Sequence, residues 1–142
     1  MKHLKLFLIS LLMVLGCDKK EDGIDMDINP EYLIATWRLE KVTLNDIDGA
    51  DINDWISTST ILGIDSDKTY FRNYVHGTWT LDGNTLTLGL GDNTDWEYRI
   101  LELSNNSLTV EVTLTERQYC CDFSQFEDIE PITIIEKYFK EE

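Results

Sequence analysis

Basic side chains, histidine and cysteine are scarce in this chain of 142 residues. It carries 12 lysines and arginines against 27 aspartates and glutamates, so its formal net charge is −15. Because binding to nucleic-acid phosphates needs an excess of cations, this balance argues against a nucleic-acid partner. With two histidines, three cysteines and no Cys-x-x-Cys pair, the sequence does not predict a zinc site. A glycine-rich phosphate loop is also lacking, and we expect no cofactor.

Groups suited to nucleophilic catalysis are equally few. His76 is the only histidine after residue 16, and because it directly precedes Gly77 in a hairpin-like stretch we expect it to point to solvent. A serine, threonine or cysteine nucleophile needs a base beside it. Paired carboxylates for glycoside hydrolysis would have to come from acids that are more simply explained as surface charge. The sequence therefore predicts that the protein is not an enzyme.

A long apolar run occurs only at the start of the chain. Lys2 and Lys5 give a basic start, and residues 6–15 are almost entirely apolar. This length matches the hydrophobic region of a signal peptide and is about half of what a membrane-spanning helix needs. The run ends at Val14-Leu15-Gly16-Cys17, which resembles the lipobox of bacterial lipoproteins. The resemblance implies that residues 1–16 are a cleaved signal peptide and that Cys17 is lipidated, which anchors the protein to a membrane.

Residues 17–31 are expected to be a polar tether between the lipid and the folded domain. The mixed lysine and acidic cluster at 18–23 resembles the surface-export signal of Bacteroidetes lipoproteins. In enteric bacteria, an aspartate directly after the lipidated cysteine resembles an inner-membrane retention signal instead. We expect a lipid-anchored protein of the cell envelope, at the outer membrane, with its periplasmic or external orientation left open.

Cys120 and Cys121 are the only cysteines left after lipidation, and they are adjacent in the sequence. Compartments beyond the inner membrane favour oxidation. Adjacent cysteines pair only through a strained ring of non-standard geometry. Free thiols, thiols paired with a partner and a disulfide between the two neighbours therefore all remain open.

From residue 33 onward, short runs with alternating apolar residues are separated by turn residues. Such a pattern is typical of β-strands. We expect eight of them, at residues 33–44, 58–64, 69–75, 77–81, 86–90, 95–103, 108–114 and 132–139. The apolar phase shifts between Leu39 and Val42, which indicates a bulge in the first strand. Asp82-Gly83-Asn84 is the clearest tight turn, because glycine adopts positive φ readily.

Most connections between these strands are short, and this favours an up-and-down arrangement over a Greek-key sandwich. The sequence therefore predicts an all-β domain over residues 32–142, a single eight-stranded antiparallel barrel. Closing the barrel removes the exposed strand edges that promote aggregation. Two longer acidic loops, at 45–57 and 118–131, are expected to connect its strands.

Several stretches across residues 33–140 resemble the lipocalin-like lipoproteins of Bacteroidetes. They are Thr36-Trp37-Arg38-Leu39, the run from Gly77 to Leu88, the run from Leu103 to Val110, and Lys137-Tyr138-Phe139-Lys140. Lipocalins carry Gly-x-Trp on the first strand, where the tryptophan packs across the closed end of the barrel, and this chain has Ala35-Thr36-Trp37. Thr94-Asp95-Trp96 is similar to a second lipocalin motif, and Lys137 replaces the arginine expected near the last strand. The resemblance implies a binding or structural lipoprotein rather than an enzyme.

Small eight-stranded barrels either fill with side chains or hold one small ligand. We expect Trp37, Trp79 and Tyr98 to point inward and to line a shallow binding cup, with Trp55 near its rim. Our leading hypothesis is a non-catalytic protein that binds a small apolar or amphipathic molecule. The alternative is a filled barrel whose acidic loops contact another protein of the envelope.

A weak calcium candidate lies in the first acidic loop. Asp46, Asp48 and Asp51 alternate with other residues around Gly49, as oxygen ligands of calcium often do. The spacing departs from the EF-hand order, and the closing glutamate is missing. A solvated acidic loop is the simpler interpretation, so the sequence predicts no metal site.

Overall fold

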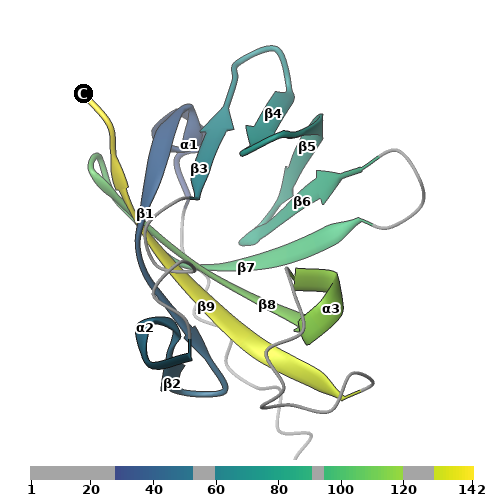
Figure 1. The fold of residues 1–142 in the computed structure, drawn as a ribbon. Coiled ribbons are helices and arrows are strands. Elements are labelled where there is room, and N and C mark those ends of the chain that lie inside the picture. Colours follow the sequence, from purple (N-terminus) through teal and green to yellow (C-terminus); the bar gives the residue numbers. More distant parts are fainter. Residues whose placement is uncertain (1–27, 53–59, 91–94, 120–129) are drawn as a thin grey trace, which may run out of the picture.

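The strands of this protein form one antiparallel sheet that closes on itself (Figure 1). The computed structural model describes residues 28–52, 60–90, 95–119 and 130–142. Its strands are β1 (Ala35–Leu44), β2 (Ile47–Asp48), β3 (Ile61–Ile64), β4 (Thr69–Arg72), β5 (Val75–Asp82), β6 (Thr85–Gly89), β7 (Trp96–Leu103), β8 (Ser107–Thr115) and β9 (Pro131–Lys140). Three helical turns accompany them, α1 (Pro30–Leu33), α2 (Gly49–Ile52) and α3 (Glu116–Tyr119).

Strand β1 closes the sheet into a barrel. Its residues 35–38 pair with β3, and its residues 37–44 pair with β9, the last strand. From β3 to β9 each strand pairs with the next one along the chain. The two-residue β2 pairs only with the end of β1 and is additional to the eight barrel strands. The predicted eight-stranded up-and-down barrel is therefore confirmed.

The predicted bulge in the first strand is also confirmed. The pairing of β1 with β9 shifts between Leu39 and Lys41. One extra residue at this point lets Leu39 and Val42 both face the core, although they are three positions apart. A second shift, between Ile100 and Glu102 of β7, was not predicted.

The turn between β4 and β5 lies earlier than the sequence suggested. It falls at Asn73 and Tyr74, so the prediction of separate strands at 69–75 and 77–81 was wrong in its boundary. Asn73 takes a positive φ of 53°, and its side-chain oxygen accepts the Ile61 N–H at 2.9 Å. Gly77 lies within β5, where a Cβ would approach the Gly89 carbonyl oxygen to 2.0 Å. This glycine therefore permits a close contact between strands and does not make the turn.

Other local predictions have mixed outcomes. Gly83 does form the β5–β6 turn, with a φ of 56°. His76 is exposed, as expected, but it lies inside β5. The first part of the 45–57 connection is ordered as β2 and α2, whereas the sequence predicted only an acidic loop. Cys17, Trp55, Cys120 and Cys121 lie outside the described residues. No helix among the described residues is long and apolar enough to cross a membrane.

The barrel has two ends, which we name after their helical turns. The α1 end carries α1 and the turns after β3, β5 and β7; the α3 end carries α2, α3 and the β4–β5 turn. Two buried tryptophans are fixed to the backbone of the α1 end. The indole N–H of Trp37 donates to the Leu33 carbonyl, and that of Trp79 donates to the Asp65 carbonyl, both at 2.9 Å. Both indoles are therefore buried and hydrogen-bonded to the backbone at the α1 end.

Candidate functional site

A fully buried carboxylate lies inside the barrel. Strand β9 alternates along its length, and Ile132, Ile134, Glu136 and Tyr138 all face the core. Glu136 therefore occupies a position at which the strand pattern calls for an apolar residue, and its exposed fraction is 0%. A buried ionised carboxylate is costly unless it is paired and hydrogen-bonded.

The Glu136 carboxylate accepts hydrogen bonds from three side chains, which lie in β4, α3 and β9. A terminal guanidinium nitrogen of Arg72, in β4, lies 2.6 Å from its Oε1. The hydroxyl of Tyr119, in α3, donates to the same oxygen at 2.7 Å. The hydroxyl of Tyr138 donates to Oε2, also at 2.7 Å. The cluster thereby ties α3 and β4 to the last strand.

Aromatic rings surround the Arg72 guanidinium. Its central carbon lies 5.3 Å from the ring centroid of Trp96 and 5.4 Å from that of Tyr119. Both distances are within the range of cation–π attraction. Burial acts to lower the pKa of Arg72, but Glu136 and the nearby tyrosine oxygens together raise it well above its ordinary value. Arg72 therefore remains a cation, although its side chain is only 13% exposed.

The tyrosines of the cluster are held in their protonated form. Burial raises the pKa of Tyr98, Tyr119 and Tyr138 well above the ordinary value, and the charge of Glu136 raises it further. A phenol that stays protonated donates hydrogen bonds and does not act as a nucleophile. The cluster therefore suits recognition of a polar group better than proton transfer.

Two polar atoms of this cluster have no hydrogen-bond partner among the described residues. They are Nε of Arg72 and the hydroxyl oxygen of Tyr98, and both are inaccessible to solvent. Tyr98 lies close enough to Glu136 for the carboxylate to raise its pKa, but no hydrogen bond of ordinary geometry joins them. Because leaving a buried polar group unsatisfied costs about 1–3 kcal/mol, these atoms are candidates for contact with a water molecule or a ligand.

An apolar cavity of about 70 Å³ lies directly beside Arg72 at the α3 end of the barrel. It is lined by Tyr70, Arg72, Val75, Leu88, Leu90 and Trp96. Val75 is 46% exposed and marks the side on which the cavity meets solvent. Tyr74, the next residue in the β4–β5 turn, is 97% exposed. The apolar cavity is therefore lined both by the buried Arg72 side chain and by the half-exposed Val75.

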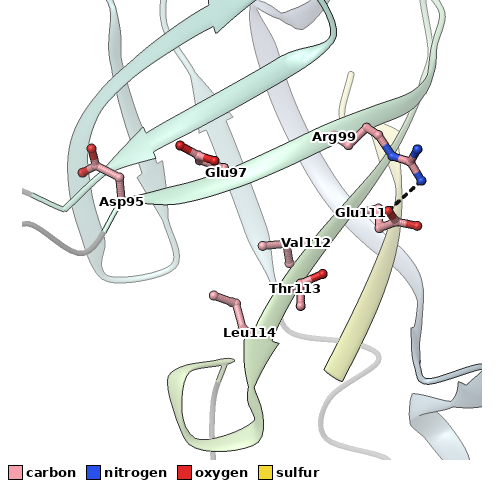
Figure 2. Close-up of a pocket in the computed structure, with 7 residues that line it drawn as sticks. All are labelled: Asp95, Glu97, Arg99, Glu111, Val112, Thr113 and Leu114. Atoms are coloured by element: carbon pink, nitrogen blue, oxygen red, sulfur yellow. Dashed lines mark hydrogen bonds and ion pairs between the residues drawn. The ribbon is translucent and has the colours of Figure 1, made fainter. Parts of the chain in front are cut away.

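A second, larger recess of about 410 Å³ opens in the barrel wall between β7 and β8 (Figure 2). It is lined by Asp95, Glu97, Arg99, Glu111, Val112, Thr113 and Leu114. The figure shows the two strands diverging beyond the ion pair between Arg99 and Glu111, whose charged atoms are 2.7 Å apart. This recess and the apolar cavity share no lining residue.

The predicted ligand-contacting aromatic residues occupy different places in the barrel. Trp37 and Trp79 are buried near the α1 end, and neither lines the cavity or the recess. Tyr98 is buried too, but it belongs to the polar cluster around Glu136. The structure thus does not bring the three together around one cup, and their role as ligand contacts stays a prediction. Trp55 lies outside the described residues.

The acidic calcium candidates are engaged in protein contacts or exposed. The carboxylate of Asp48 pairs with Lys41 at 2.9 Å and accepts the Ala50 N–H at 3.0 Å. These two contacts lower its pKa, the hydrogen bond from Lys41 most strongly. Asp46 and Asp51 are exposed. Within the described ranges, no three His, Cys, Asp or Glu side chains form a metal-binding group.

Lys137, which stands where an arginine is expected near the last strand, lies on the outer face of the barrel. It points outward from β9 and pairs with Glu40 at 3.0 Å, with about half of its side chain exposed. The alternation of β9 explains this, because Glu136 and Tyr138 on either side of it face the core. Among the described residues, Arg72 of β4 is the cation that lies inside the barrel.

Sequence analysis missed Arg72 and Glu136 as site residues. A signal for Glu136 was present, because it falls in the apolar phase of residues 132–138. Arg72 likewise falls in the phase of the buried Tyr70. Their pairing could not be predicted, because 64 positions of sequence separate them.

The chain matches a known protein family. A model of the lipocalin-like domain family matches residues 33–110, which is 78 of 142 residues and more than half of the chain. The closed eight-stranded barrel agrees with this match. The chain belongs to the lipocalin-like domain family. No curated protein and no solved structure matches it.

Proposed function

We propose that this protein is a non-catalytic binding protein whose barrel takes up one small apolar or amphipathic molecule at the α3 end. The main observation is that the side chain of Arg72, whose buried Nε has no described partner, lines an apolar cavity. Binding sites for small molecules combine mostly apolar walls with a few convergent polar groups. A lipocalin-like barrel is consistent with such a role.

The charges of the cluster indicate which polar group the ligand carries. Arg72 and Glu136 form a pair of opposite charge, so the cluster is neutral as a whole. An additional buried charge would have no counter-ion and would pay its full desolvation cost. The atoms that await a partner are the Arg72 N–H and the Tyr98 hydroxyl. We therefore propose that the ligand presents an uncharged acceptor, such as a carbonyl, ether or hydroxyl oxygen.

The size of the cavity limits how much of the ligand enters. A volume of about 70 Å³ is well below the several hundred Å³ of a typical ligand pocket. Only a small end group fits, and the remainder would lie along the rim at Tyr74 and Val75, which are both exposed. An apolar remainder would cover part of the surface that these two residues expose to water.

We also propose that the protein acts at the cell envelope. The lipobox-like ending at Cys17 supports a lipid anchor, and residues 17–31 supply the tether. A non-catalytic role is supported by the engagement of Glu136, whose carboxylate accepts hydrogen bonds from three donors and is not free to act as a base.

A filled barrel that contacts another protein is the second candidate. The small cavity volume favours it, because most of the interior is occupied by side chains. In this case the acidic segments at 45–57 and 118–131 would provide the contact surface. Recovery of the same partner from membranes after replacement of residues 45–57 would contradict that surface.

Native mass spectrometry of protein purified from its own host without denaturation tests the binding proposal. We expect an added mass that disappears on unfolding. The Val75→Trp variant blocks the rim at a half-exposed position and should lose this mass. Tyr32→Trp, at a similarly exposed position of α1 at the opposite end, is the control and should keep it. Bare protein, or an added mass that both variants keep, would contradict the proposed cavity.

A further inference from the structure

The recess between β7 and β8 contains two strand edges that face each other. The β7–β8 ladder ends at the pair Arg99↔Glu111. Beyond this pair, residues 96–98 of β7 pair only with β6 among the described residues. Residues 112–115 of β8 pair, within the same ranges, only with β9. The Thr115 N–H is already taken by the side-chain oxygen of Gln118 at 2.9 Å. The remaining backbone groups along 96–98 and 112–114 that point toward the gap can accept an added strand.

The space between these edges is sufficient for a short segment of chain. The recess has a volume of about 410 Å³ and is lined by both strands. Figure 2 shows Asp95 just before β7 and Glu97 within it on one side of the opening, and Val112 and Leu114 along β8 on the other. The recess therefore lies directly between the two open edges.

The side chains along the recess are acidic in sum. Asp95, Glu97 and Glu111 carry negative charge, and Arg99 is neutralised by Glu111 at 2.7 Å. Two negative charges remain on the β7 side. A segment bound here gains from positive side chains, whereas a second copy of this chain, with a net charge of −15, would be repelled.

The strand alternation decides which of the bound segment's side chains carry the charge. On the β7 side, Glu97 faces outward and Tyr98 faces the core. On the β8 side, Thr113 faces outward, and Val112 and Leu114 face the core. A strand placed between them would continue both faces of the sheet, because successive side chains point to opposite faces. Its inward residues meet apolar side chains, and its outward residues meet carboxylates.

From these observations we infer that the gap between β7 and β8 binds an extended segment of another protein in which basic and apolar residues alternate. The segment adds to the sheet as an extra strand through backbone hydrogen bonds. The alternation of side chains gives specificity, and the acidic rim selects for lysine and arginine. This site is separate from the cavity beside Arg72, so failure of either proposal leaves the other standing.

Synthetic peptides test this inference with the full-length protein, purified from its own cells in an uncharged detergent. One hexapeptide alternates lysine and valine, and a second has the same composition with three lysines followed by three valines. We expect the alternating peptide to bind at least about tenfold more tightly, because only it matches both faces of the gap. Equal affinity would indicate simple charge attraction and would overturn the inference.

Two further measurements locate the binding. Hydrogen exchange should slow on addition of the alternating peptide in residues 95–98 and 112–114, and protection confined to other segments would contradict the site. The Glu97→Gln variant should weaken binding by about two- to fivefold, as expected for one partly exposed charge. Glu102→Gln is the matched control, since it removes an exposed carboxylate from the paired part of β7. An equal effect of both variants would refute the contact.

Discussion

Removing the cation of the buried cluster should destabilise the protein far more than removing a cation at the surface. In the Arg72→Met variant, Glu136 keeps the hydroxyls of Tyr119 and Tyr138 but loses its counter-ion. Breaking a buried ion pair typically costs about 3–5 kcal/mol. Because two donors remain on the carboxylate, we expect the lower part of this range, about 3 kcal/mol. Arg99→Met is the control.

The control breaks an ion pair of similar length but different exposure. Arg99 lies 2.7 Å from Glu111, and its side chain is 57% exposed, against 13% for Arg72. Exposed pairs contribute about 1 kcal/mol or less. Urea unfolding at neutral pH measures both variants. With a slope of about 1.5 kcal/mol per molar urea, Arg72→Met should lower the midpoint by about 2 M and Arg99→Met by well under 1 M.

A second substitution distinguishes charge pairing from simple loss of packing. Glu136→Gln keeps the shape of the side chain and leaves the Arg72 charge buried without a counter-ion. If the loss in Arg72→Met comes from the unpaired carboxylate, the double variant should be more stable than the sum of the single losses, by about 3 kcal/mol. Additive losses, or equal midpoints for Arg72→Met and Arg99→Met, would refute the interpretation of the cluster as a coupled buried pair.

Three further predictions concern pH, glycine positions and the anchor. The folded pKa of Tyr98 lies above its ordinary value of 10.0, so the stability it contributes is complete below pH 10 and declines above it. Tyr98→Phe removes a buried hydroxyl without a described hydrogen-bond partner, so it should raise stability at pH 7 by about 1 kcal/mol. It should also reduce the alkaline loss by about 1.4 kcal/mol per pH unit in urea unfolding, and an unaltered slope would contradict this. Gly77→Ala should lower the free energy of unfolding by about 3 kcal/mol, because its Cβ would meet a backbone oxygen at 2.0 Å. Gly83→Ala should lower it by about 1 kcal/mol, because Gly83 has open space around it and only a positive φ. Thermal unfolding measures both, and the reverse order would disprove the contact. Cys17→Ala should release the protein from the membrane fraction, as fractionation and immunoblotting would show, and unchanged membrane association would exclude lipid on this residue as the sole anchor.

Local features of the structure were largely readable from the sequence. The phase shift between Leu39 and Val42 predicted the bulge that β1 contains. Gly83 predicted the β5–β6 turn because positive φ is a property of a single residue. The eight alternating runs indicated the barrel because each run has one apolar face that must be buried. The turn at Asn73 was missed, since Gly77 is the stronger turn former in isolation and its role in spacing β5 from β6 depends on the fold.

Which side chains meet across the barrel was decided by the tertiary structure alone. Alternation by itself determined that Arg72 and Glu136 occupy inward positions of their strands. Strand tilt and register determined that they meet, although they are 64 positions apart in the sequence, and that Tyr119 and Tyr138 join them. The gap beyond Arg99 and Glu111 has the same origin, because pairing between two strands depends on the path of the whole sheet and not on the residues of either strand. Faces and turns are set by neighbours along the chain, whereas the site is set by contacts between distant residues that only a closed barrel brings together.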